Sequence, residues 1–282
     1  MKTLLLTGAG GFVGSRILQQ LRPRFALTPF SSAVLRCGDE AAVLREVAAC
    51  RPDYIVHTAA ISDTGYSQAH PDESYAANVA LPVHLAKAAR AVGAKLLAFS
   101  SDQVYTGLTH PGPYDEQEPL QPANVYGRHK REAEERMLEI CPDSVHLRAT
   151  WMYDLPGYGL PVRENLLTTL LRAAWEGRER TYATQDYRGV TYVRHVIELL
   201  VPALDLPGGV YNFGSENKLN MYETACDFAD ALCLRLNIRP DGEAPYRSLS
   251  MSCAKLKGCG ITPDDTQQGI RCCVRDYALN RW

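Results

Sequence analysis

Tyr126 and Lys130 are four residues apart in the segment NVYGRHKREAEER and could together act as a proton donor. On a helix, positions four apart project from one face, one turn from each other. A nearby ammonium group favours the phenolate and lowers the phenol pKa from its ordinary value of ~10 toward neutral pH. A chance pairing is the alternative, because the chain contains 15 tyrosines.

Ser101 directly follows Ser100 at the end of the apolar segment Lys95–Phe99, which predicts a strand. Ligands of parallel sheets bind at the carboxyl ends of the strands, so this hydroxyl would face a crevice. It could hydrogen-bond a substrate carbonyl oxygen and hold it toward Tyr126. A turn or a helix cap is the alternative for a Ser-Ser-Asp sequence after a strand.

The N-terminal segment TLLLTGAGGFVG predicts a site for a dinucleotide cofactor. An apolar strand precedes Gly8, which turns the chain, and Gly11 allows backbone amides to approach a phosphate. Gly14 allows the following helix to pack close to the strand, with its positive end toward the phosphate. A tight turn without a ligand is the alternative for a glycine triplet alone.

Strands and helices alternate over residues 1–150 and predict an α/β fold with a Rossmann-type, doubly wound parallel sheet. Expected strands are Lys2–Thr7, Phe25–Phe30, Tyr54–Thr58, Lys95–Ser100 and Val145–Ala149, and expected helices are Ser15–Arg22, Asp39–Cys50, Pro71–Val92 and Asn124–Ile140. The loops after Thr7, Thr58 and Ser100 should then share one crevice, because ligands bind at the carboxyl ends of such strands.

Residues 151–282 are expected to form a smaller C-terminal α/β lobe that contacts substrate, with some elements returning to the first sheet. Helices are expected near Arg163–Glu176, Tyr192–Leu204 and Met221–Leu234, followed by a turn-rich segment and a final helix. Pro156, Gly157, Gly159 and Pro161 predict a mobile loop that closes over the substrate.

The composition is that of a globular protein, with 282 residues and a net charge of -2. Nucleic acid and anionic membranes are not expected partners, because the chain has no basic field. The apolar run of MKTLLL stops at Gly8, short of the ~7–15 residues of a signal peptide, so the cytoplasm is the expected compartment. The oligomeric state stays open, with a homodimer as one candidate.

The 9 cysteines form no Cys-x-x-Cys motif and are interpreted as buried free thiols. Cys272 and Cys273 are adjacent, so one of them should face outward. His57, His84 and His129 have no metal-ligand spacing, and structural or surface roles are expected for them. No metal site is predicted.

At this point the sequence resembles the extended short-chain dehydrogenase/reductases, and within them the dTDP-4-dehydrorhamnose reductase group. The similarity covers nearly the whole chain: TGAGGFVG resembles the cofactor turn, PDYIVHTAAIS the strand and loop beside the nicotinamide, and AANVALPVHLAKAARAVGAKLLAFSSDQVYTG the central helix and catalytic strand. PANVYGRHKREAEE resembles the active-site helix, LRATWMYD the segment after it, and APYRSLSMSCAKL a late turn.

The resemblance implies that Tyr126 is the general acid and that Lys130 binds the nicotinamide ribose and lowers the Tyr126 pKa. Ser101 would anchor the substrate carbonyl, and Asn78 would support the site unless it only packs on the backbone. Implied cofactor contacts, besides Tyr126 and Lys130, are Gly8, Gly11, Phe12, Val13, Gly14, Arg36, Cys37, Ala59, Ala60 and Ile61. Implied substrate contacts are Ser101, Asp102 and Trp151, with a core aromatic as the alternative for Trp151.

Departures from the family pattern refine the expected reaction. Gln103 replaces the glutamate of related 4,6-dehydratases and cannot abstract a proton, which disfavours dehydration. Arg36 replaces an acidic residue, which favours NADP over NAD, although a surface arginine is the alternative. The segment Asp186–Thr191 lacks the proline of the group, and Arg247 lies in an altered turn, so the sugar or nucleotide can differ.

The resemblance therefore implies an NAD(P)H-dependent reductase of a nucleotide-linked 4-keto-6-deoxy sugar, as in dTDP-rhamnose biosynthesis. One alternative is a nucleotide-sugar epimerase of the same class, which retains its nicotinamide through the cycle. The other is a non-catalytic NADP-binding regulatory subunit, because the group also resembles a regulatory subunit of methionine adenosyltransferase.

Overall fold

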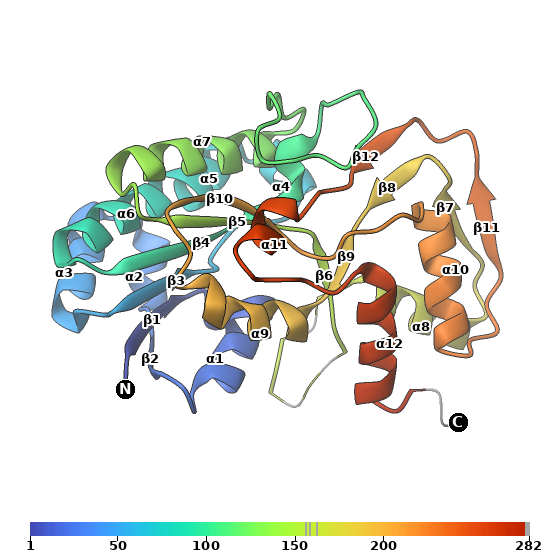
Figure 1. The fold of residues 1–282 in the computed structure, drawn as a ribbon, viewed down its shortest axis with the longest axis horizontal. Coiled ribbons are helices and arrows are strands. Elements are labelled where there is room, and N and C mark those ends of the chain that lie inside the picture. Colours follow the sequence, from blue (N-terminus) through green and yellow to red (C-terminus); the bar gives the residue numbers. More distant parts are fainter. Residues whose placement is uncertain (156, 158, 162, 280–282) are drawn as a thin grey trace.

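The structure is a computed structural model that describes residues 1–155, 157, 159–161 and 163–279. Its centre is a six-stranded sheet in the order β10-β5-β4-β3-β1-β2 (Figure 1). All neighbouring strands in it are parallel. The strands are β1 (Thr3–Thr7), β2 (Ala26–Pro29), β3 (Tyr54–His57), β4 (Lys95–Ser101), β5 (Val145–Ala149) and β10 (Gly209–Phe213).

Helices cover both faces of this sheet (Figure 1). The helices α1 (Phe12–Leu21) and α9 (Val193–Ala203) lie on one face, and α3 (Glu40–Cys50), α6 (Leu81–Val92) and α7 (Val125–Ile140) lie on the other. Leu4 and Leu6 face the first layer and Leu5 faces the second, since side chains alternate along a strand. Burial on both faces explains why the middle of β1 is an uninterrupted run of three leucines.

The predicted doubly wound α/β sheet is confirmed, with local differences. The α1 helix begins at Phe12 instead of Ser15, because Gly11 is its N-cap. The predicted helix Pro71–Val92 runs through α5 (Pro71–Tyr75), a π-helical turn η1 (Ala76–Ala80) and α6. The helices α2 (Ser32–Cys37) and α4 (Thr64–Ala69) were not predicted, and Ser31 and Asp63 cap them.

The C-terminal half forms a smaller unit of short paired strands and helices. The pairs are β6 (Trp151–Tyr153) with β9 (Val190–Tyr192), β7 (Arg180–Ala183) with β11 (Ile238–Asp241), and β8 (Asp186–Arg188) with β12 (Arg247–Leu249). Its helices are α8 (Leu166–Glu176), α10 (Met221–Ala231) and α12 (Thr266–Asp276). Tyr153, Leu167, Phe228 and Ile270 belong to its core.

Three later elements return to the first sheet. β10 pairs with β5 at the sheet edge, and α9 packs beside α1, with Ile17 and Ile197 in one core cluster. The short helix α11 (Ala254–Gly258) packs beside β10, and its Leu256 belongs to the same cluster. Among the residues described here, no helix combines the length and apolarity needed to cross a membrane.

Candidate active site

A cleft of about 550 Å³ lies at the carboxyl ends of the central strands, between the sheet and the C-terminal unit. The loops after β1, β3 and β4 meet there, as the sequence predicts. The predicted site residues that line it are Gly11, Phe12, Val13, Gly14, Ala60, Ser101, Asp102, Tyr126, Lys130 and Trp151. Arg163, Arg188 and Arg247 line it from the C-terminal half.

The glycine turn brings α1 against β1. Gly8 has φ +71°, and the Gly11 amide donates to the Gly8 carbonyl oxygen at 2.8 Å. A Cβ on Gly14 would collide with that same carbonyl oxygen. Gly11 caps α1 without a side chain, so the first-turn amide N–H groups, including those of Phe12 and Val13, can donate to phosphate oxygens. These residues fit the pyrophosphate of a nicotinamide dinucleotide.

Asn78 fixes the loop that follows β3. Its Nδ2 donates to the Ile61 carbonyl oxygen at 2.9 Å, and its Oδ1 accepts from the Ile61 amide at 3.1 Å. The residue lies on the π-helical turn η1, a rare conformation that is frequent at functional sites. Asn78 therefore packs on the backbone and at the same time positions the loop that carries Ala59 and Ala60.

Ser101 and Asp102 are held in a buried network where β4 enters the 3-10 helix η2 (Asp102–Tyr105). The Ser101 Oγ accepts from the Gln103 amide at 3.2 Å and donates to Asp102 Oδ1 at 3.2 Å. Ser101 is thus a cap and a cleft residue at once. Both polar atoms of the Gln103 side chain are hydrogen-bonded: its Nε2 donates to Asp102 Oδ1, and its Oε1 accepts from Asn124 Nδ2.

Tyr126 and Lys130 point from the first turns of α7 toward the sheet, and both are buried. The Lys130 Nζ lies 5.8 Å from the centroid of the Tyr126 ring and donates to the Phe99 carbonyl oxygen at 2.9 Å. Burial lowers the pKa of Lys130 to about 8, and the Glu134 charge partly opposes this shift.

Burial also raises the pKa of Tyr126 well above its usual range. A hydrogen bond with Ser101 opposes this rise, the Asp102 charge adds to it, and the Arg163 charge opposes it. The sequence predicts that Lys130 lowers the pKa of Tyr126. In the structure, the groups that lower the pKa of Tyr126 are instead Ser101 and Arg163. The charged form of Lys130 is itself disfavoured by burial.

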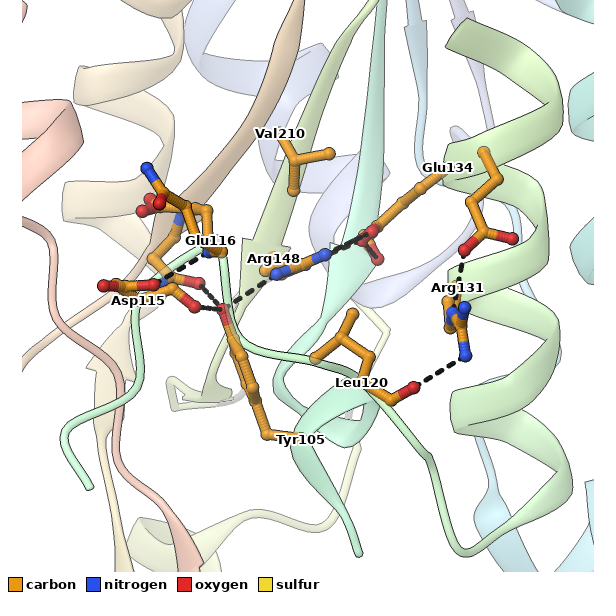
Figure 2. A network of polar contacts seen from close by, with 12 residues as sticks. Tyr105, Asp115, Glu116, Leu120, Arg131, Glu134, Arg148 and Val210 are labelled. Atoms are coloured by element: carbon orange, nitrogen blue, oxygen red, sulfur yellow. Dashed lines mark hydrogen bonds and ion pairs between the residues drawn. The ribbon is translucent and has the colours of Figure 1, made fainter. Parts of the chain in front are cut away.

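A buried ion pair missed by the sequence analysis supports α7 (Figure 2). Glu134 lies one turn beyond Lys130, and its Oε2 pairs with Arg148 Nη2 at 2.7 Å. Arg148 Nη1 also donates to the Tyr105 hydroxyl at 2.9 Å, which in turn donates to the Asp115 carbonyl oxygen. The network ties α7 to β5 and η2. Tyr126, Lys130 and Glu134 at intervals of four form one stripe, and this spacing was the available signal.

Trp151 is half-buried in the cleft wall, and the Arg188 guanidinium lies 5.4 Å from its ring centroid. Arg188 Nη2 donates to Asp102 Oδ2 at 2.7 Å. Arg163 Nη1 reaches Ser62 Oγ after β3 at 2.5 Å. The helix expected near Arg163–Glu176 begins only at Leu166, so Arg163 lies in the loop before it, and Arg188 ends the three-residue strand β8. Neither position could be assigned to the cleft from a local pattern.

Four other predicted residues are not among the described residues that line the cleft: Gly8, Ala59, Ile61 and Arg36. Arg36 is exposed on α2. The side chain of Cys37, and Pro156 and Tyr158 of the expected mobile loop, lie outside the described residues. The described cysteine side chains are free thiols, but the expected burial is wrong for Cys233 and Cys259, which are exposed.

The three histidines considered in the sequence each contact a neighbour away from this cleft. His57 Nδ1 lies 2.7 Å from Thr7 Oγ1. His129 Nδ1 lies 3.0 Å from Ser74 Oγ, and His84 Nε2 lies 3.3 Å from a Glu40 carboxylate oxygen.

A parallel sheet with a glycine turn after β1, and a buried tyrosine and lysine beside a serine at the end of β4, define an extended short-chain dehydrogenase/reductase. The chain belongs to the RmlD substrate binding domain family, which matches residues 1–252.

Individual relatives carry different names. A dTDP-4-dehydrorhamnose reductase of Streptomyces griseus is 39% identical over 155 residues, which are 54% of this chain and 51% of that protein, so the match spans about half of its length. Methionine adenosyltransferase 2 subunit beta of Xenopus laevis is 28% identical over 285 residues, 91% of this chain and 82% of that protein. The structure of dTDP-4-dehydrorhamnose reductase from Bacillus anthracis in complex with NADP has the same fold, with a TM-score of 0.88, 23% identity and 98% of each chain covered.

Proposed function

We propose that the protein is an NADPH-dependent reductase of the C4 ketone in a nucleotide-linked 4-keto-6-deoxy sugar, similar to dTDP-4-dehydrorhamnose. The observation that carries this proposal is the meeting of Ser101, Tyr126 and Lys130 in one cleft beside the glycine turn. The family and the name of the Streptomyces griseus relative support the substrate class.

Each residue has a definite task in this proposal. The amides at the start of α1 hold the pyrophosphate, and Lys130 donates to a ribose hydroxyl. Ser101 holds the substrate oxygen, and Tyr126 donates its proton to that oxygen as negative charge develops on it. The bound dinucleotide supplies the hydride.

The charge of the cleft supports an anionic substrate. Among the residues that the structure describes, its lining contains four cationic side chains and two carboxylates: Lys130, Arg163, Arg188 and Arg247 against Asp63 and Asp102. The chain as a whole has a net charge of -2, so this positive balance is local. A cationic cleft raises the local concentration of a sugar nucleotide, whose diphosphate can bind arginine in a bidentate way.

Gln103 supports reduction over dehydration. Its amide already contacts Asp102 and Asn124, and an amide cannot take up a proton as a carboxylate does. Arg36 supports NADPH over NADH, since its guanidinium is exposed on α2 and free to reach a 2′-phosphate. NADH remains the alternative cofactor.

A non-catalytic NADP-binding subunit is the second candidate, and the similarity to methionine adenosyltransferase 2 subunit beta favours it. An epimerase of the same class is the third. The three differ in the fate of the cofactor: a reductase consumes it, an epimerase recycles it, and a binding subunit leaves it unchanged.

The test is the absorbance of NADPH with purified protein and enzymatically generated dTDP-4-dehydrorhamnose, with NADH run in parallel. Rapid oxidation of NADPH that depends on the sugar is the expected result. NADPH that binds but stays reduced with this sugar and with a panel of other keto-sugar nucleotides would contradict the reductase. Interconversion of sugars without net oxidation would identify an epimerase.

A further inference from the structure

A second cluster of metal-ligand side chains lies away from the cleft, where α9 approaches α12. His195 belongs to α9, Asp264 directly precedes the N-cap of α12, and Cys272 belongs to α12. One nitrogen, one carboxylate oxygen and one sulfur from these residues all lie within 4.8 Å of one another.

The imidazole of His195 has an unusual relation to its neighbours. Its Nδ1 lies 3.0 Å from Asp264 Oδ2, yet this buried atom has no hydrogen-bond partner among the described residues. A hydrogen bond requires the N–H to point at the acceptor. Two ligands of one tetrahedral metal ion stand about 3.4 Å apart without that alignment, given metal–ligand distances of ~2.1 Å. The 3.0 Å distance is that of a hydrogen bond, but the alignment of one is missing, and this orientation suits two ligands that point at a shared ion.

We propose that His195, Asp264 and Cys272 form a site for one divalent transition-metal ion of the Zn²⁺ type, with water as a fourth ligand. The combination of nitrogen, oxygen and sulfur suits such an ion, whereas Mg²⁺ and Ca²⁺ prefer oxygen ligands alone. On binding, the Cys272 thiol releases its proton to solvent and the imidazole binds in its neutral form.

Arg275 does not block this site. Its Nη2 donates to Cys272 Sγ at 3.4 Å, and its Nε lies 3.6 Å from Asp276 Oδ1. The Arg275 side chain is 73% exposed, so it can leave the sulfur and keep its contact with Asp276. Arg194 pairs with the other carboxylate oxygen of Asp276, Oδ2, so this ion pair need not change when Arg275 leaves the sulfur.

The position of the site indicates a structural role. α9 packs on the central sheet through Val196 and Ile197, and α12 packs in the C-terminal core through Ile270 and Val274. An ion at this point would link the sheet to the C-terminal unit. The sequence shows no Cys-x-x-Cys motif and no metal-ligand spacing at His57, His84 or His129, and His195 is far from Asp264 and Cys272 along the chain, so no local pattern indicates this site.

Co²⁺ titration of the chelator-treated full chain is the first test, because a cobalt-bound thiolate gives a near-ultraviolet charge-transfer band. One equivalent of Co²⁺ should produce this band, and Zn²⁺ should abolish it by displacement. Zn²⁺ at about 100 times its Kd should also raise the Tm by about 5 °C.

The variants Cys272→Ser and His195→Gln should lose both the band and the Tm shift, and Asp264→Asn should bind at least tenfold more weakly. Cys259→Ser removes an exposed thiol elsewhere and should bind as the wild type does. Far-ultraviolet circular dichroism of the metal-free variants should match the wild type, which separates lost ligands from lost folding. No cobalt–thiolate band in the wild type, or a band that survives in Cys272→Ser, would overturn the proposal. NADPH binding and turnover do not enter this test.

Discussion

Arg188 and Asp102 form an ion pair across the cleft, with Nη2 and Oδ2 2.7 Å apart. The pair joins β8 of the C-terminal unit to the end of β4, and the Asp102 side chain is 3% exposed. The Asp102 charge raises the pKa of Tyr126, the proposed proton donor. Arg188 neutralises the Asp102 carboxylate and so acts on Tyr126 through Asp102. The Arg188 guanidinium also lies over the Trp151 ring, so Arg188 links the wall of the cleft to the end of β4.

The variant Arg188→Gln should lower the free energy of unfolding by about 2–4 kcal/mol, because it leaves the buried Asp102 carboxylate without its cation. The double variant with Asp102→Asn should recover part of this loss, since no buried charge then remains. Urea unfolding of the two single variants and the double variant measures the coupling. Strictly additive losses would show that the pair contributes nothing to stability.

Gly14→Ala should both destabilise the protein and weaken dinucleotide binding. Its Cβ would collide with the Gly8 carbonyl oxygen and with Thr58 Oγ1, which would force α1 away from β1. Gly10→Ala is the matched control, because a Cβ there meets nothing within 4 Å and should change stability by no more than about 0.5 kcal/mol. Tm and NADPH fluorescence titration measure both effects. Equal behaviour of the two variants would contradict the close approach of the glycine turn to α1.

His57 should make the protein sensitive to acid. Burial lowers its pKa to about 3, so between pH 6.5 and 3 the unfolded chain binds a proton that the folded chain excludes. Its contribution to stability is complete above pH 6.5 and is lost at about 1.4 kcal/mol per pH unit as the pH falls through this window.

His57→Asn can retain the hydrogen bond with Thr7 Oγ1 and does not titrate in this window. Urea unfolding at several pH values from 6.5 to 4.5 should give a shallower decline for this variant. His110→Asn, at an exposed position, should keep the wild-type slope. A wild-type slope in His57→Asn would mean that His57 is protonated in the folded protein.

Lys130 should set the basic limit of activity. Burial lowers its pKa to about 8, so its ammonium is present below that pH and is lost above it, while the raised pKa of Tyr126 keeps the phenol protonated there. The value of kcat/KM should therefore fall above pH ~8. Lys130→Arg keeps a positive charge at high pH, so its kcat/KM should no longer fall above pH ~8, whatever its absolute activity. The same fall in the variant would show that another group causes the loss of activity.

The fold was predictable where the signal is local. The run of leucines in β1, the glycine turn and the Asp39 cap of α3 depend on neighbouring residues only, and the structure contains each of them. The helices α2 and α4 were missed because each has 6 residues, too few for periodicity, although Ser31 and Asp63 are recognisable caps.

The cleft was predictable only in part, because a sequence pattern indicates only what neighbouring residues determine. Ser101, Tyr126 and Lys130 come from the ends of predicted elements, so their meeting follows from the order of strands and helices. Arg163 and Arg188 reach the cleft through the packing of the C-terminal unit, where strands such as β8 have 3 residues and no readable alternation. Their role depends on tertiary contacts that local sequence does not contain.

The most direct test of the proposed reaction compares Tyr126→Phe with the wild type, using NADPH and enzymatically generated dTDP-4-dehydrorhamnose. The substitution removes only the phenol hydroxyl, so NADPH affinity should stay within about twofold while turnover falls by ~10²-fold or more. Full turnover in Tyr126→Phe, with NADPH binding intact, would show that Tyr126 is not the proton donor and would contradict the mechanism.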